Sequence, residues 1–441
     1  MIVKVRKLLR KILAITFIIA FFIASWFGLR YISVDDSSSY TRLTMHEFYN
    51  QENIDILFMG ASHCYRGFDT NVTDEMLGCN TFNLGSSSQL LDTTYLLMRE
   101  AVETYDIDHI YVDLSYNVSK ESIKRGENLT SAYIITDYMR PSLKKIAFLL
   151  NKSGEGNYSN SFLAARRNWQ NIFDLRYVYS VLMKKGSPEY LNFAYIDGID
   201  GGKERYAGKG FVENDREIAD GSFKDTFENE TFNLDDIDED WITIVKKMIK
   251  YCDNHNVKLT FISVPISSYR LLCYKDYDSY ISFIEGIISE SGSNKVNYID
   301  FNLMREKYWP DTSTYYIDYS HLNTLGAKEF SRVFCQYING SISEEELFYS
   351  SISEKYENTE ANFYGLEYET SPDGKSIHCH MIASRPNSFQ SKVTFYHEGR
   401  EYVLKELSDG LDFGIPSDFS GVCKVEILYC NGTSKYYEIS F

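Results

Sequence analysis

The sequence predicts an α/β fold: a three-layer domain built on a mainly parallel sheet, with a membrane-spanning helix before it and a small all-β module after it. Three observations predict this. Short β-rich runs alternate with longer helical patterns over residues 55–339, as in doubly wound sheets. One long uncharged stretch lies within residues 1–30. Residues 361–441 alternate apolar and polar side chains, with turn residues about every ten positions, which is typical of a β-sandwich.

The composition allows a chain of several parts. With 441 residues, 44% hydrophobic and 15% aromatic, it can bury more than one core. We expect a cytoplasmic tip and membrane anchor at residues 1–30, an α/β domain at 31–340, a linker at 341–360 and a β-sandwich-like module at 361–441. The last module could bind glycan or only pack against the domain before it.

The N-terminal stretch has the features of a membrane anchor. Residues 12–29 carry no charge and reach the roughly 18 residues of a candidate spanning helix. Five basic residues precede them: Lys4, Arg6, Lys7, Arg10 and Lys11. Such a flank keeps the N-terminus cytoplasmic, so the rest of the chain is expected outside the cell membrane. A cleaved signal peptide is the alternative, but the end of the stretch, Ser25-Trp26-Phe27-Gly28, offers no small-x-small cleavage site.

Apolar runs predict five strands of a doubly wound sheet. They are residues 54–59, 81–84, 110–114, 259–264 and 296–301. Helical periodicity predicts helices at 89–104, 241–255 and around 280–289. The repeat is interrupted at about residues 118–235, which we interpret as an insertion near the active face with helices of its own, such as 142–150 and 162–183.

Charge and cysteine content limit the partners. A formal charge of −17 argues against nucleic acid or an anionic bilayer as the partner. The eight cysteines form no C-x-x-C pair and no Cys/His cluster at zinc-finger spacing, so we expect no metal site and no cofactor. Outside the cytoplasm, Cys64 could pair with Cys79 and Cys423 with Cys430; buried free thiols are equally compatible with the sequence.

Two short motifs carry the chemistry. Ser62 ends the sequence Gly60-Ala61-Ser62 directly after the first predicted strand, and reacting groups of open α/β sheets lie at the carboxyl ends of strands. Asp318 precedes His321 by three residues, just before a helix predicted to end near residue 338. Together these supply a nucleophile, a base and a carboxylate that orients the base, which predicts serine acyl transfer. The serine motif is not G-x-S-x-G, which disfavours the usual α/β-hydrolase fold.

The order of these motifs resembles the SGNH (GDSL-like) hydrolase superfamily over residues 55–339. The matching blocks are Gly60-Ala61-Ser62, Asn83-Leu84-Gly85 and Asp318-Tyr319-Ser320-His321. The resemblance implies a flavodoxin-like three-layer sheet. It also implies that Ser62 is the nucleophile, His321 the general base and Asp318 its orienting partner, with the backbone N–H groups of Ser62 and Gly85 as oxyanion donors.

One block departs from the superfamily pattern. Where an asparagine normally follows the third strand, the chain reads Asp113-Leu114-Ser115-Tyr116-Asn117. Asn117 is therefore only a weak candidate for the third oxyanion donor. A second hypothesis follows from this departure, namely a non-catalytic glycan-binding surface protein on a degenerate scaffold.

The anchor and the flanks of the first two blocks are similar to membrane-anchored bacterial members, such as the D-alanyl transfer protein of lipoteichoic acid biosynthesis and polysaccharide O-acetyltransferases. This implies an esterase or acyltransferase acting on acetyl or D-alanyl groups of a cell-surface polysaccharide or teichoic acid, with a multispanning membrane acyl exporter as a further partner. Arg66 and Gln89 would then lie near the site, either contacting substrate or supporting the fold.

Overall fold

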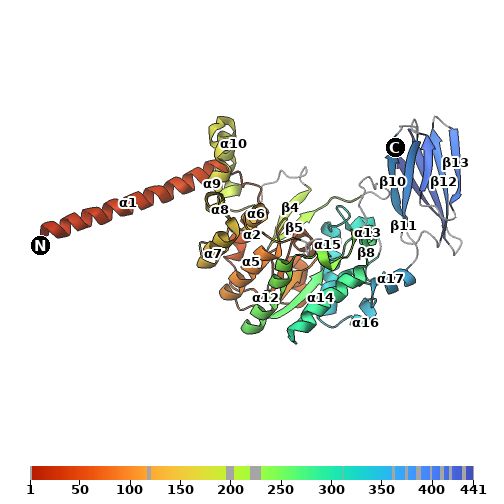
Figure 1. Ribbon diagram of the computed structural model, residues 1–441, viewed down its shortest axis with the longest axis horizontal. Coiled ribbons are helices and arrows are strands. Elements are labelled where there is room, and N and C mark those ends of the chain that lie inside the picture. The colour runs from red at the N-terminus through yellow and green to blue at the C-terminus, as the bar shows by residue number, and fades with distance from the viewer. Residues whose placement is uncertain are drawn as a thin grey trace.

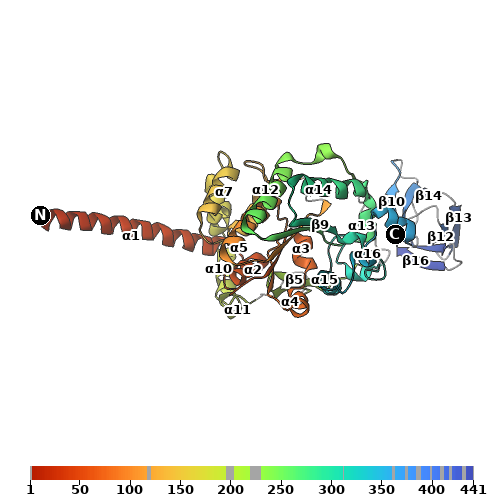
Figure 2. The ribbon, with the colours of Figure 1, turned by 90° about the horizontal axis from the view of Figure 1, so that it is seen from below.

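The computed structural model has an elongated outline, with the helix α1 (Ile2–Ser33) projecting from one side of the α/β domain and the C-terminal β-module on the opposite side (Figures 1 and 2). It describes residues 2–440 apart from 117–120, 195–202, 219–229, 311, 360–362, 373–375, 384–388, 398–399, 408–411, 417–419 and 430–433.

The central sheet has five parallel strands in the order β2-β1-β3-β7-β9. This is the flavodoxin-like 2-1-3-4-5 order of doubly wound folds, so the predicted sheet class is confirmed. The strands are β1 (Ile56–Met59), β2 (Thr81–Asn83), β3 (His109–Asp113), β7 (Lys258–Ser263) and β9 (Val296–Asp300). Each lies within two residues of its predicted bounds.

Helices cover both faces of the sheet, because alternate strand residues point to opposite sides. On one side Leu57, Ile110 and Leu259 join a core covered by α5 (Leu91–Thr104), α12 (Glu239–His255) and α14 (Tyr277–Ser291). On the other side Phe58 and Tyr111 join a second core, covered by α3 (Ser62–Gly67), α4 (Thr70–Leu77) and α15 (Thr324–Ile338). The three helices predicted around the sheet are thereby confirmed.

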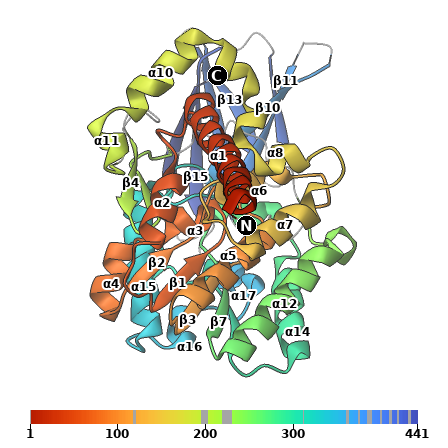
Figure 3. The same ribbon diagram turned by 90° about the vertical axis from the view of Figure 1, so that its left-hand side faces the viewer.

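The insertion divides into a helical part and a strand part. The helical part lies beside the C-terminal end of α1, where this helix meets the domain, as Figure 3 shows from the α1 side. It consists of α6 (Leu129–Thr136), α7 (Leu143–Ser153), α8 (Tyr158–Phe162), α9 (Ala164–Arg167), η2 (Trp169–Phe173), α10 (Leu175–Lys185) and α11 (Pro188–Leu191). The single helix predicted for 162–183 is wrong, because Asp174 caps a new helix by accepting from the backbone N–H groups of Arg176 and Tyr177.

The strand part of the insertion packs near the sheet edge. β4 (Glu204–Gly208) and β5 (Phe211–Asn214) form an antiparallel hairpin, whose Lys209 carbonyl accepts from the Asn83 N–H at 2.9 Å. Two further short strands, β6 (Glu230–Thr231) and β8 (Tyr274–Lys275), pair in parallel. The remaining short helices of the domain are α2 (Tyr40–Phe48) and α13 (Ser268–Cys273).

The stretch at 341–360, expected as a linker, packs on the α/β domain. It forms α16 (Glu344–Leu347) and α17 (Ile352–Asn358), and the side chains of Leu347 and Ile352 are buried. The Lys355 ammonium, also buried, donates to the Asn302 carbonyl at 2.8 Å. Apolar side chains within an acidic sequence explain why this connection follows the domain surface.

The C-terminal module contains two antiparallel sheets, which agrees with the predicted sandwich-like architecture. Their orders are β10-β11-β14 and β13-β12-β15-β16. The strands are β10 (Phe363–Thr370), β11 (Ser376–Ala383), β12 (Phe389–His397), β13 (Arg400–Leu407), β14 (Asp412–Pro416), β15 (Val422–Tyr429) and β16 (Ser434–Ser440).

The thiols of Cys64 and Cys79 are free, so the disulfide considered for them is absent. Burial raises the pKa of the Cys64 thiol well above its usual value, so it stays protonated and packs as a small apolar group. The alternative pair, Cys423 with Cys430, involves a residue outside the described part of the chain.

We predict that Gly210→Ala destabilises the protein. Gly210 has a φ of +82°, and a Cβ there would collide with the Asn83 carbonyl oxygen. The combined strain and clash should cost about 1–3 kcal/mol. Gly286→Ala is the matched control, since Gly286 is exposed in α14 with no atom near its Cβ direction, and alanine there should gain up to about 1 kcal/mol. Equal melting temperatures for the two variants would contradict the close docking of the hairpin.

Candidate active site

Ser62 is positioned by a tight turn at the carboxyl end of β1. Gly60 in this turn has a φ of +152°, and a Cβ there would lie 2.7 Å from the Asp113 Cβ, so the turn requires glycine. Ser62 is the first residue of α3, and the N–H groups of a first helical turn have no acceptor within the helix. The Ser62 N–H therefore belongs to a set of backbone donors at this edge of the sheet.

His321 is held on a rigid base. The isolated bridge between Tyr316 and Leu322 and the bond from the Ile317 N–H to the His321 carbonyl, 2.9 Å, close its loop. Asn323 follows as the N-cap of α15, accepting from the Gly326 N–H at 2.9 Å. The Asn323 amide also donates to the Thr314 carbonyl at 2.7 Å. A capped helix thus fixes where the imidazole can point.

The structure brings Ser62, His321 and Asp318 into one chain of hydrogen bonds. The Ser62 Oγ lies 2.7 Å from the His321 Nε2, although the two residues are 259 positions apart. The other ring nitrogen, Nδ1, lies 2.9 Å from the Asp318 Oδ2. These are the distances and the order that a nucleophile, a base and its orienting carboxylate require.

Asp318 is held as a carboxylate. Burial raises its pKa, but hydrogen bonding to His321 and to the backbone N–H groups of Ser320 and His321 outweighs this and brings the pKa to about 2. Its side chain is 52% exposed and that of His321 25%, so water screens the pair. Both side chains are therefore partly accessible to solvent.

A second, buried histidine lies behind the first. The His63 ring stacks on the His321 ring with 4.8 Å between centroids and 11° between planes. Its Nδ1 lies 3.2 Å from the Ser115 Oγ, which donates to the Asp113 Oδ2 at 2.8 Å. The His63 Nε2 is buried with no hydrogen-bond partner. Sequence reasoning missed this group; its only signal was that His63 follows the serine.

Burial sets the protonation of this group. It lowers the pKa of His63 to about 3, and the neighbouring His321 acts in the same direction. It raises the pKa of Asp113 to about 7, against the opposing hydrogen bond from Ser115. His63 is therefore a neutral ring at neutral pH, and no second positive charge lies against His321 from this side.

Gly85 reaches the edge where it was expected, but its N–H is already used. It donates to the Asn83 Oδ1 at 2.9 Å, while the Asn83 Nδ2 donates to the Cys64 carbonyl at 2.9 Å. A Cβ on Gly85 would lie 2.9 Å from the Tyr65 nitrogen, so glycine is needed for close packing on α3. Asn117 lies outside the described residues.

Arg66 and Gln89 are both tied to protein groups. The Arg66 Nη2 forms a 3.0 Å ion pair with the Glu204 Oε2 of the insertion hairpin, both side chains being mostly buried. Gln89 accepts from the Ser86 Oγ at 2.9 Å and donates to the Thr94 Oγ1 at 3.0 Å. Of the two roles considered for them, these contacts favour support of the fold.

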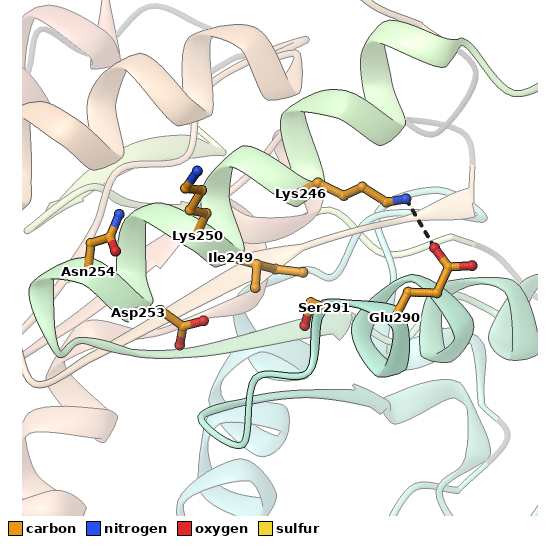
Figure 4. A pocket seen from close by; sticks show the side chains of 7 residues that line it. All are labelled: Lys246, Ile249, Lys250, Asp253, Asn254, Glu290 and Ser291. Atoms are coloured by element: carbon orange, nitrogen blue, oxygen red, sulfur yellow. Dashed lines mark hydrogen bonds and ion pairs between the residues drawn. The ribbon is translucent and has the colours of Figure 1, made fainter.

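A hollow elsewhere on the domain shows no link to this site. It lies between α12 and α14, has a volume of about 350 Å³ and contains the exposed Lys246–Glu290 pair at 3.0 Å (Figure 4). The ends of α12 and α14 that line it lead into β7 and β9, so it lies at the amino edge of the sheet, opposite Ser62. No group of three His, Cys, Asp or Glu side chains suited to a metal occurs among the described residues.

The solved structures named here resemble this chain in fold, at low sequence identity. No protein family matches the sequence, and no curated protein does. Solved structures that resemble it include a GDSL-like lipase from Bacteroides thetaiotaomicron, with 11% identity, a TM-score of 0.30, and 69% of this chain and 100% of that chain covered. A protein described as an acylhydrolase, from Bacteroides fragilis, has 10% identity, a TM-score of 0.30, and coverages of 67% and 94%. At this level the likeness concerns fold, and the site rests on its own geometry.

We predict that His63 makes stability depend on pH. The unfolded ring binds a proton below about pH 6.5, whereas the folded ring does so only below about 3, so stability falls as the pH drops through this window. His63→Phe keeps the stack but removes the titration. Relative to wild type, the variant should gain about 2 kcal/mol in urea unfolding between pH 7 and pH 5. His255→Phe, at an exposed position on α12, controls for the change of side chain. An unchanged difference between wild type and His63→Phe at both pH values would contradict the buried neutral ring.

Proposed function

We propose that this protein is a membrane-anchored serine esterase or O-acyltransferase that works outside the cytoplasm on O-acyl groups, acetyl or D-alanyl, of a cell-surface polysaccharide or teichoic acid. The observation that carries the proposal is the hydrogen-bonded chain from the Ser62 Oγ through His321 to Asp318. Side chains from two distant parts of the sequence adopt an arrangement that activates a serine hydroxyl.

The reaction proceeds in two steps through an acyl-enzyme. The Ser62 Oγ attacks the acyl carbonyl carbon as its proton passes to the His321 Nε2, and the resulting imidazolium is stabilised by the Asp318 carboxylate. The imidazolium then protonates the departing alcohol. In the second step an acceptor hydroxyl gives its proton to Nε2 and attacks the acyl carbon of the ester on Ser62. The bond from this carbon to the Ser62 Oγ then breaks as the imidazolium returns the proton to Oγ, which restores the free serine. Water as acceptor yields the free acid, and a sugar hydroxyl yields an acylated glycan.

The first donor to the oxyanion is the backbone N–H of Ser62, at the beginning of α3. The Gly85 N–H is the second donor, provided that the Asn83 carboxamide turns its oxygen away when substrate binds, because this oxygen now accepts from Gly85. Asn117 stays a weak third donor.

The helix α1 supports the proposed location. The helix has an 18-residue window of mean hydropathy 2.4 that is not buried in the protein, long and apolar enough to span a membrane or to be a signal sequence. With a basic flank before it, we place the N-terminus in the cytoplasm and the domain outside. A substrate polymer would reach the half-exposed His321–Asp318 pair from the open side, and a multispanning acyl exporter would supply the donor.

A glycan-binding protein without catalysis is the second candidate. The internal use of the Gly85 N–H favours it, since an occupied donor cannot hold an oxyanion. The β-module would then provide the binding surface. The reactivity of Ser62 separates the two candidates directly.

Ser62→Ala should abolish both covalent labelling by a fluorophosphonate probe and the burst of p-nitrophenol from p-nitrophenyl acetate, because in the described part of the chain the Ser62 hydroxyl is the one bonded to the His321 Nε2. Labelling is read by gel fluorescence and the burst by stopped flow. Ser282→Ala, an exposed serine on α14, is the matched control and should behave as wild type. A wild-type protein that takes up no probe would favour the non-catalytic candidate, and a burst that persists in Ser62→Ala would exclude Ser62.

Asp318→Asn should reduce kcat by a factor on the order of 10³–10⁴, because the amide can neither hold the required tautomer of His321 nor stabilise the imidazolium. KM should change little, since Asp318 contacts the imidazole and not the substrate. Steady-state hydrolysis of p-nitrophenyl acetate measures both constants. Asp240→Asn, an exposed carboxylate on α12, provides the control. A loss below tenfold would mean that Asp318 does not orient His321 during turnover.

A further inference from the structure

The helical part of the insertion carries an unusual set of exposed apolar side chains. Six of them, which we call the collar, lie on η2 and α10: Trp169, Phe173, Leu175, Tyr179, Leu182 and Met183. Phe173 is 74% exposed and Leu175 80%. Monomeric proteins in water rarely expose apolar groups together like this, so the collar calls for a partner.

The collar is one face of its helix. Leu175, Tyr179, Leu182 and Met183 follow the spacing i, i+4, i+7 and i+8, which puts them on one side of α10. The other side is anchored by Val181 and Lys185, both buried. Trp169 and Phe173 continue the same surface through an edge-to-face contact of 5.7 Å between ring centroids. α7 repeats the pattern with Leu143, Ile146 and Leu150, all exposed.

The local charge differs from that of the whole chain. The protein has 62 acidic against 45 basic residues, yet α7, η2 and α10 contain no aspartate or glutamate. Lysine or arginine occurs instead, as in Arg176 and Lys184 of α10. Exposed apolar and aromatic side chains with basic residues and no acidic ones are the composition of helices that lie in the membrane interface. Asp174, the N-cap between η2 and α10, is the acidic exception, and Lys184 pairs with Asp35 at 2.6 Å. These helices are nevertheless poorer in acidic residues than the chain as a whole.

The collar is attached to the C-terminal end of α1, where this helix meets the α/β domain. Tyr31 of α1 donates to the Lys185 carbonyl at 3.1 Å, and Tyr177 of α10 donates to the Ser33 carbonyl at 3.2 Å. The buried Lys185 ammonium pairs with the Asp36 carboxylate at 2.8 Å, directly after α1. Figures 1 and 3 show α10 lying across the direction of α1 at the side of the domain from which α1 leaves.

We propose that the collar inserts into the outer interface of the bilayer that α1 spans. The proposal rests on the membrane anchoring proposed above. Because α10 crosses the direction of α1 at the C-terminal end of α1, α10 runs along the membrane surface when α1 spans the bilayer. The occupant is lipid because the collar is continuous with the lipid-facing helix. The domain is then held at two places, which fixes its orientation above the membrane.

Fluorescence quenching in the full chain tests this directly. The chain has four tryptophans; Trp241 and Trp309 are buried and Trp26 lies in α1. The Trp26→Phe chain is reconstituted into phosphatidylcholine vesicles with bromine either near the headgroup end or near the methyl end of the acyl chains. Subtracting the Trp26→Phe/Trp169→Phe chain isolates Trp169. Interfacial insertion to about 5–10 Å should make the shallow bromines quench Trp169 more strongly than the deep ones.

Two variants at exposed sites keep the test independent of folding. The double variant Phe173→Glu/Leu175→Glu should show at most half of the Trp169 quenching measured without these two substitutions. Leu234→Glu, 59% exposed and outside the collar, should leave it unchanged. An equal effect of both variants would overturn the proposal, since lipid contact would not depend on the collar.

Other outcomes separate this proposal from the proposed function. Unquenched Trp169 in a chain that stays with the vesicles through alkaline washing would overturn the collar and leave the anchor standing; the apolar face would then be free for a membrane protein. Loss of the chain from the vesicles would overturn both anchor and collar. Hydrolysis of p-nitrophenyl acetate in the same samples reports on the serine chemistry separately from either result.

Discussion

The packing of α3 against α15 is the constraint on which the site depends. Ser62 begins α3 and His321 precedes α15, and the two helices are joined by the rings of Phe68 and Phe330, 5.1 Å apart. Behind them Phe68 stacks on Phe58 of the central strand β1 at 4.0 Å. The hydroxyl of Ser331 in α15 accepts from the Asp69 N–H at 2.8 Å in the same layer. Because aromatic cores are close-packed and resist small displacements, this layer holds the 2.7 Å contact between serine and imidazole without help from bound substrate.

The orientation of the His321 ring depends on His63, which is not part of the hydrogen-bonded chain from Ser62 to Asp318. A flat ring can rotate about its side-chain bonds unless something packs on it, and His63 does so from the buried side. A protonated His63 would repel the imidazolium that the proposed reaction forms on His321. Burial prevents this by lowering its pKa to about 3. The protein thus uses a neutral histidine as a polar spacer, with its Nδ1 bonded through Ser115 toward Asp113.

Strands and site residues could be predicted from the sequence where a short local motif identifies them, but not where they depend on contacts between distant residues. The strands of the central sheet could be predicted because buried parallel strands are short apolar runs. Ser62, Asp318 and His321 could be singled out because each lies in a short motif beside a regular element, and the structure brings all three together. The His63–Ser115–Asp113 group could not, since nothing in the spacing of residues 63 and 115 says that they meet. The internal bond of Gly85 likewise depends on the rotamer of Asn83. The helix expected at 162–183 was wrong because Asp174 caps α10, and a run of helical spacing does not by itself show where one helix ends and the next begins.

The insertion contacts two separate parts of the protein, namely the sheet edge beside Ser62 and the end of α1. Its hairpin reaches the sheet edge. There Glu204 forms an ion pair with Arg66, one turn after Ser62, and the Lys209 carbonyl accepts from the Asn83 N–H. Its helices reach back to α1, where Lys185 and Asp36 form a buried pair. An unpaired charge at such a site would be strongly unfavourable, so the junction between α1 and α10 is specific and does not act as a free hinge. The insertion therefore contacts the α/β domain beside Ser62 through its hairpin and the end of α1 through its helices. Under the proposed function, the fixed junction between α1 and α10 would limit the directions in which the domain can face the membrane, and so the directions from which a membrane-bound polymer can approach.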